Sequence, residues 1–206
     1  AVGIICLIGF LMGVIIAFET ALVAQIFGAV IFVVNGIGIA MTRELGPLMT
    51  AILFAGRSGS AFAAQLGTQK VNEELNALTT FGLSPMYFLV VPRLIASSLV
   101  VLLLSVFATI LGILGGGLVM AMYDITYTQF YVQLLKSVTV TDIVFGLVKA
   151  VIFGFVIALI GCQCGMNTGA GAAAVGSSTT KSVVKSIIWI VVIDGAAALL
   201  TNRLGI

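Results

Sequence analysis

Histidine is absent from the 206-residue sequence, and charged residues make up only 8% of it. Without histidine, the histidine general bases and histidine metal ligands used by many enzymes are excluded. A soluble domain carries about a quarter charged residues, so the low charge also excludes an ordinary soluble fold. The net charge of +2 is too small to indicate a nucleic-acid partner.

Cysteine is scarce as well, with Cys6, Cys162 and Cys164 the three in the chain. A Cys-x-Cys pair with one distant thiol is a poor metal site, because tetrahedral zinc takes four ligands. No nucleophile with a neighbouring base is visible either. We therefore predict neither a metal site nor catalytic residues.

A glycine-rich stretch, "GAAAVGSS" (residues 171–178), has two glycines at the spacing of a phosphate-binding loop. Ser177 stands where that motif needs a lysine to hold the β- and γ-phosphates. We expect no ATP binding by this chain, and we predict that residues 165–180 form a flexible or tightly packed loop.

Apolar residues make up 61% of the chain, and its mean hydropathy is +1.30. Several uncharged runs approach or exceed the roughly 20 residues that cross a bilayer. They cover residues 1–18, 20–42, 94–123 and 150–180. The sequence therefore predicts an all-α polytopic membrane protein, with a single transmembrane domain over residues 1–206.

Five membrane-spanning helices are expected, with Asn35-Gly36 as a turn between the first two. Pro47 should bend or break the second. The expected ranges are 3–26, 36–66, 86–122, 142–164 and 181–202. Lysine and arginine are modestly more frequent in the loops that follow the second and fourth spans, which favours a cytoplasmic N-terminus.

Two shorter amphipathic helices are expected between the spans. Tyr123, Tyr127, Phe130, Tyr131 and Leu134 recur at helical spacing after the third span, and Thr126 with Gln129 fits a capping box. This pattern is typical of a helix lying at the outer membrane interface.

The second short helix is expected at residues 69–82, on the cytoplasmic side, with Gly82 as its C-cap. It either lies on the membrane surface or docks into a groove on a cytosolic partner. Adjacent acids fit poorly with anionic lipid headgroups, which favours a protein partner. Its apolar face holds Val71, Leu75 and Leu78, and its charges are Lys70, Glu73 and Glu74.

Charges inside the apolar spans are the candidates for function, because such groups usually face a cavity or pair with each other. Arg43 and Glu44 precede Pro47, where a broken helix would free backbone groups that need a cavity or a protein neighbour. Arg57 is equally open to pairing, to snorkelling and to function. Asp194 is either proton-labile or paired with Arg57 or Lys149.

The stretch "RELGPLMTAILFAGRSGSAFAAQLGTQKVNEELNALTTFGLSPMYFLVVPRLIA" (residues 43–96) closely resembles the signature region of MlaE-type permeases. Residues 170–200 resemble the last loop and fifth span of that family more weakly. These permeases are membrane subunits of MCE-associated ABC transporters, which move phospholipids between the two membranes of Gram-negative envelopes.

The resemblance implies a homodimer in the bacterial inner membrane, bound to a separate ATPase that holds ATP and magnesium. It also implies a periplasmic MCE-domain partner and an N-terminal elbow helix, which this chain is expected to lack. Residues 69–82 would be the coupling helix, seated in the ATPase. A lipid pocket at the dimer centre would include Arg43, Glu44, Leu45, Leu48 and Met49.

Three alternatives remain open at this point. The first is an ABC permease for another hydrophobic substrate, because the sequence does not identify the lipid headgroup. The second is a proton-coupled carrier that uses Glu44 and Asp194. A passive anchor for a periplasmic ring is the third alternative, and it requires neither a pocket nor Glu44.

Overall fold

The computed structural model describes residues 2–204, and in that range every regular element is a helix. Within residues 2–204, five helical runs are long and apolar enough to cross a membrane. They are Val2–Ile26, Val30–Val71, Met86–Ala121, Val140–Met166 and Ala172–Thr201. The predicted all-α polytopic membrane protein is therefore confirmed.

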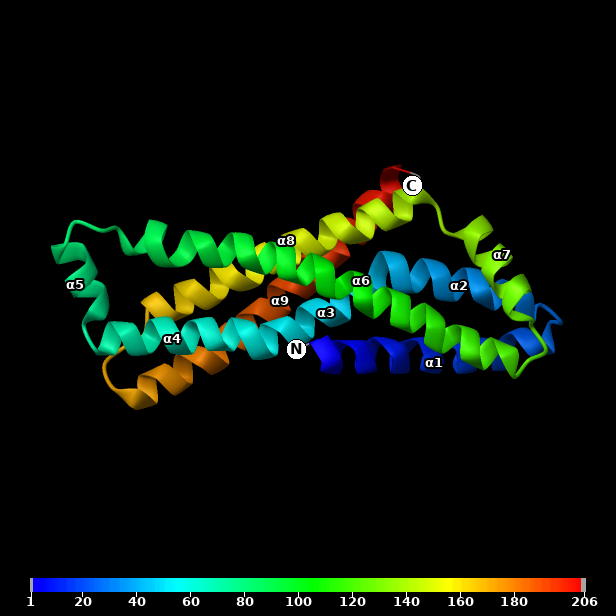
Figure 1. Cartoon of the computed structure of the whole chain (residues 1–206), viewed down its shortest axis with the longest axis horizontal. Coiled ribbons are helices and arrows are strands. Elements are labelled where there is room, and N and C mark those ends of the chain that lie inside the picture. Colours follow the sequence, from blue (N-terminus) through cyan, green and yellow to red (C-terminus); the bar gives the residue numbers. More distant parts are fainter. Residues whose placement is uncertain (1, 205–206) are drawn as a thin grey trace. The chain divides into compact units, whose positions relative to one another are not determined.

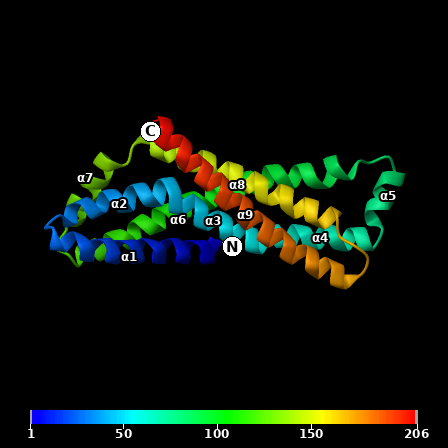
Figure 2. The ribbon, with the colours of Figure 1, turned by 180° about the vertical axis from the view of Figure 1, so that it is seen from behind.

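The chain divides into two compact units. The first unit comprises residues 1–50 and 102–150. In Figures 1 and 2, α1, α2 and the later part of α6 lie side by side within it. Its elements are α1 (Val2–Ile26), η1 (Val30–Phe32), α2 (Val33–Ile39), η2 (Ala40–Leu45), the first half of α3 (Gly46–Phe54), the later part of α6 (Val91–Ala121), α7 (Tyr127–Ser137) and the start of α8 (Val140–Met166).

Glycines allow α1 and α6 to pack with their backbones in contact in the first unit. A Cβ atom at Gly13 would overlap the carbonyl oxygen of Gly112, and one at Gly9 would lie 2.6 Å from that of Ala108. Only glycine leaves room for so close an approach, which is the usual way that helices associate in lipid.

The second span continues without a loop from Val30 to Val71. Asn35-Gly36, expected to be a turn, lies inside α2, and the chain turns instead at residues 27–29, where Gly28 has a φ of 63°. The Asn35 side chain is used in packing, since its Oδ1 accepts a hydrogen bond of 2.8 Å from Gln133 of α7. The turn prediction was wrong because a neighbouring helix binds that asparagine.

Pro47 does not break this helix with a loop. The turn before it widens into a π-helix, η2, and Gly46 donates its N–H to the carbonyl of Met41, five residues earlier. The hydroxyl of Thr109 donates a second hydrogen bond, of 3.2 Å, to the same carbonyl. The ring of a proline clashes with the preceding helical turn, and the wider turn accommodates it.

The second unit comprises residues 51–101 and 151–206. In it α9 packs along η3 and α4, and the Ser182 hydroxyl donates a 3.3 Å hydrogen bond to the carbonyl of Gly59. Its elements are the second half of α3, η3 (Ala55–Gly59), α4 (Ser60–Val71), α5 (Glu74–Thr80), η4 (Met86–Val90), the first part of α6, the rest of α8 and α9 (Ala172–Leu204).

The glycine-rich loop is much shorter than expected, because α9 already begins at Ala172. Only residues 167–171 separate α8 from α9. The Thr168 hydroxyl donates a 2.9 Å hydrogen bond to Ser178, which ties the loop to the first turns of α9. Three consecutive alanines follow Gly171, and alanine has the highest helix propensity, which explains the early start.

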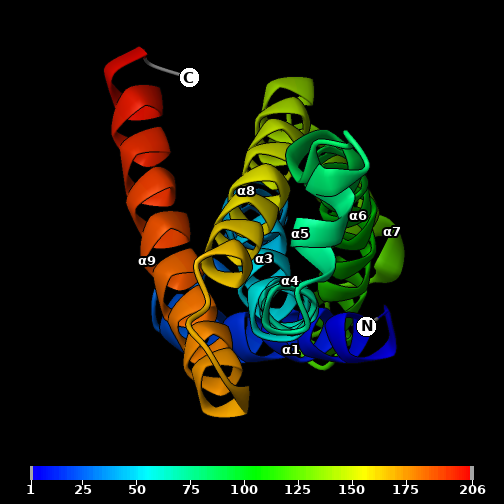
Figure 3. The same cartoon turned by 90° about the vertical axis from the view of Figure 1, so that its left-hand side faces the viewer.

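Both short helices are present. The helix predicted at residues 69–82 is shorter in the structure, where it is α5, because Glu73 has a φ of 61° and separates it from α4. Figure 3 shows α5 between the end of α4 and the start of the helix that continues into α6. The capping box of Thr126 and Gln129 begins α7, as predicted.

Candidate functional site

A cluster of four charged side chains lies in the first unit, between η2 and the start of α8. Arg43 Nη1 donates a 3.3 Å hydrogen bond to Asp142 Oδ1. Lys149 Nζ donates a short hydrogen bond to Glu44 Oε2. The Nε of Arg43 lies 3.9 Å from Glu44 Oε1, so the two ion pairs are joined into one network.

The four charged side chains are mostly buried. The Lys149 side chain is only 2% exposed, whereas that of Glu44 is 33% exposed and is the most accessible member. The ring of Phe145 is near both cations, with Arg43 at 5.3 Å and Lys149 at 5.6 Å from its centroid. Cations and aromatic faces attract more strongly where water is scarce.

Asp142 is held in place by the start of α8. Its Oδ2 accepts hydrogen bonds from the backbone N–H of Thr139, at 3.0 Å, and from the Thr139 hydroxyl, at 2.6 Å. The Asp142 N–H in turn lies 3.3 Å from the Thr139 hydroxyl, so the two residues form a capping box. The second carboxylate oxygen is left to bind Arg43.

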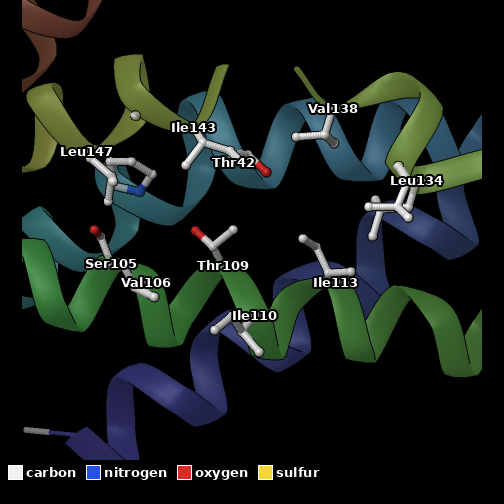
Figure 4. Close-up of a pocket in the computed structure, with 13 residues that line it drawn as sticks. Thr42, Ser105, Val106, Thr109, Ile110, Ile113, Leu134, Val138, Ile143 and Leu147 are labelled. Atoms are coloured by element: carbon white, nitrogen blue, oxygen red, sulfur yellow. The ribbon is translucent and has the colours of Figure 1, made fainter. Parts of the chain in front are cut away.

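An apolar cavity of about 440 Å³ lies beside this cluster, also within the first unit. Thr42 and Pro47 contribute to it from the second span, together with residues of α6, α7 and α8. Figure 4 shows these side chains converging on one space, with α6 on one side and α8 on the other. Two sites of different character, one charged and one apolar, therefore adjoin η2.

The residues predicted for the lipid pocket lie in η2 and at the start of α3. Arg43 and Glu44 belong to the charged cluster, and Leu45, Leu48 and Met49 are half-buried beside it. None of these five residues lines the 440 Å³ cavity, whereas Pro47, predicted to break the helix, does. The dimer pocket itself stays a prediction.

The predicted coupling-helix residues are divided between two helices. Lys70 and Val71 end α4, and Glu73 occupies the turn that follows. Within α5, Glu74 and Leu78 line a 320 Å³ groove that continues to Phe81, Phe88 and Leu89. Leu75 is half-buried.

The two remaining intramembrane charges lie in the second unit. Arg57 is exposed within η3, a second π-helical turn, and Asp194 is half-buried in α9. Lys149 was considered as a partner for Asp194. In the structure, Lys149 contacts the carboxylate of Glu44. The roles of Arg57 and Asp194 remain predictions.

The sequence interpretation did not place Asp142, Phe145 and Lys149 in the site. Their spacing contained a signal, because residues at i, i+3 and i+7 share one face of a helix. Two of them are charged and lie at the start of an otherwise uncharged apolar span. A search for the partners of Arg43 and Glu44 along one helix face would have found them.

Comparison with known proteins identifies related permeases. The sequence model of the family described as "Permease MlaE" matches residues 1–200. A probable ABC transporter permease of Rickettsia typhi is 34% identical over 92% of this chain and 73% of its own length. A probable ABC transporter permease of Synechocystis is 37% identical, over 87% of this chain and 68% of its own.

A plant relative is also similar. The protein named trigalactosyldiacylglycerol 1, chloroplastic, of Arabidopsis thaliana is 38% identical over 77% of this chain and 45% of its own length. The family match covers nearly the whole chain, and the two bacterial relatives are each at least 34% identical over most of it. This chain therefore belongs to the MlaE permease family and is an ABC transporter permease subunit.

Proposed function

We propose that this permease moves phospholipids between the inner and outer membranes of a bacterial envelope. It works as a homodimer in the inner membrane, with a separate ATPase on the cytoplasmic side and an MCE-domain protein on the periplasmic side. The lipid is held at the dimer centre by the segment from Arg43 to Met49.

The observation that carries this proposal is the charged cluster and the residues beside it. Asp142 and Lys149 of α8 are buried and bind Arg43 and Glu44, while a third of the Glu44 side chain stays accessible. Leu45, Leu48 and Met49 follow directly and are half-buried in the single chain. A polar group next to accessible apolar side chains suits a molecule with a charged headgroup and hydrocarbon tails.

A lipid substrate is also supported by a relative. The name of the Arabidopsis protein contains that of a galactose-bearing diacylglycerol, which is a membrane lipid. In our proposal the phosphate of the transported lipid lies at Arg43, and its tails lie against Leu45, Leu48 and Met49. Glu44 and Asp142 fix the position of the Arg43 guanidinium.

The coupling to ATP hydrolysis runs through the second span. The span from Val30 to Val71 is one continuous helical run, and α5 follows it after a short turn. Closure of the ATPase would push α5, and the span would transmit the displacement to residues 43–49. No catalytic group is needed in this chain, because the partner hydrolyses ATP.

The test is lipid transfer by the permease reconstituted with its ATPase in vesicles, with Arg43→Ala and Glu44→Ala as the variants. Loss of a charge-assisted hydrogen bond of about 1.5–3 kcal/mol predicts a fall in transfer rate of about tenfold or more. Glu19→Ala is the matched control, because Glu19 is an exposed acid near the end of α1.

Each outcome decides between the alternatives. Wild-type transfer by both Arg43→Ala and Glu44→Ala, with the ATPase still bound, would refute the pocket. Transfer driven by a proton gradient without nucleotide would favour the proton-coupled carrier. Mass spectrometry of lipids extracted with the purified protein identifies the headgroup, and a substrate other than a phospholipid would correct the proposal.

A further inference from the structure

The 440 Å³ cavity is separate from the residues assigned to the transported lipid. It lies inside the first unit, and its walls come from the second span, α6, α7 and α8 of one chain. Its volume is typical of ligand sites, which range from about 300 to 1,000 Å³. The charged cluster contributes no residue to its lining.

Two of the three hydroxyl groups in the lining, those of Ser105 and Thr109, already donate hydrogen bonds to backbone carbonyls. The Thr109 hydroxyl donates to the carbonyl of Met41 at 3.2 Å, and the Ser105 hydroxyl donates to that of Leu102 at 2.8 Å. In Figure 4 the rest of the labelled wall, apart from Thr42, is hydrocarbon. A polar ligand would therefore lose its hydration without gaining equivalent partners.

The cavity has a buried floor and an accessible, apolar rim. Pro47, Ser105 and Gly146 are buried, whereas Ile110, Leu135 and Ile143 are exposed on the surface of the unit. The exposed residues belong to two membrane-spanning helices and to the amphipathic helix α7. A rim of such side chains adjoins lipid tails, because water is absent from the hydrocarbon region.

We propose that this cavity binds one acyl chain of a membrane lipid within a single subunit. An apolar cavity of roughly 150 Å³ stays free of water and binds a small hydrocarbon in another protein, so a larger one beside lipid takes up a chain. The chain enters between α6 and α8, beneath α7, and rests against Pro47 and Gly146. The headgroup stays outside the cavity.

The inference requires only that the chain spans a membrane, and it stands or falls separately from the transport activity. Its site is complete in one subunit, whereas the transported lipid is proposed to bind at the dimer centre. An acyl chain against Thr42 would contact the widened turn of η2, the same turn that carries Arg43 and Glu44. Occupancy would then stabilise the position of η2.

Photolabelling tests the proposal. The purified full chain is placed in nanodiscs of phosphatidylethanolamine and phosphatidylglycerol, doped with a phosphatidylcholine that carries a diazirine at the end of one acyl chain. After irradiation, mass spectrometry locates the labelled residues. We expect labels to concentrate at residues 105–113 and 143–147, and to be denser there than at the exposed Leu114 and Leu118 of α6.

A matched pair of variants separates the cavity from the general lipid-facing surface. Val106→Phe places a ring in the cavity and should lower labelling of residues 143–147 several-fold. Leu103→Phe, one turn away on an exposed part of α6, should leave that labelling unchanged. Ile113→Phe replaces Val106→Phe if the latter does not accumulate in the membrane.

Two results would overturn the proposal. Equal labelling of residues 143–147 in wild type and the cavity-filling variant would show that no chain enters. Rapid reaction of Ser105→Cys, on the buried floor, with a membrane-impermeant thiol reagent would show that water fills the cavity. Loss of lipid transport in Arg43→Ala with labelling intact would leave the acyl-chain site unaffected, because Arg43 does not line it.

Discussion

Gly13→Ala tests whether backbone contact between α1 and α6 stabilises the first unit. An alanine Cβ at this position would overlap the carbonyl oxygen of Gly112 and lie 2.8 Å from its Cα. Both are backbone atoms, so no flexible side chain can move aside. The two helices must separate, and a gap of 0.5–1 Å already removes about a quarter to a half of each contact's dispersion energy.

Two opposing effects set the magnitude. Alanine favours the helix over glycine by roughly 0.5–1 kcal/mol, and forcing an extra methyl group into a packed interface costs about 1–3 kcal/mol. The overpacking is at the upper end here, because the obstacle is backbone. We expect a net loss of about 1–2 kcal/mol, or about 2–8 °C in melting temperature at about 2–4 °C per kcal/mol.

The assay is thermal unfolding of purified variants in one detergent, followed by a thiol-reactive dye or by tryptophan fluorescence. Gly36→Ala is the control, because this glycine is also helical but has no atom within 4 Å of an added Cβ. It should gain about 0.5–1 kcal/mol from helix propensity alone. A Gly13→Ala protein as stable as wild type, or more stable, would refute the close-packing argument.

The other predictions concern the charged cluster, the turn between α4 and α5, and α7. In a double-mutant cycle of Glu44→Gln and Lys149→Met, we expect a coupling energy of about 0.5–3 kcal/mol in thermal unfolding, and strict additivity would show that the ion pair contributes nothing. Glu73→Lys combined with Glu74→Lys should abolish co-purification of the ATPase, and retained binding would refute docking through this turn. Thr126→Ala removes the capping box of α7 and should cost about 1 kcal/mol, measured as above, and an unchanged melting temperature would contradict it.

The spans were predictable because their signal is strong and local. Long apolar stretches with few charges indicated five spans, and the ranges 86–122 and 142–164 agree with the structure within a few residues. The wrong predictions occurred where a short motif is compatible with two local structures. Asn35-Gly36 is typical of a turn, but Gln133 of α7 binds that asparagine inside a helix, and no local pattern contains this contact.

The site was only partly predictable, for a similar reason. Arg43 and Glu44 are conspicuous in the sequence because charges are rare in an apolar span. Their partners Asp142 and Lys149 are about 100 residues away in sequence, and only the tertiary fold brings them to η2. The apolar cavity was not predictable at all, since it arises where four elements fail to fill a space with ordinary side chains.

The widened turn of η2 also determines which residues of the second span face which neighbour. One extra residue in a turn shifts the phase of all following side chains by about 100°, because an α-helix has 3.6 residues per turn. Val34 and Ile37, before the turn, belong to the buried core of the first unit, and Thr50, after it, is also buried. Between them, the shift lets Arg43 and Glu44 meet the charges of α8 while Thr42 and Pro47 line the cavity. A uniformly α-helical segment of the same length would keep a single phase, and could match only one of these two sets of neighbours.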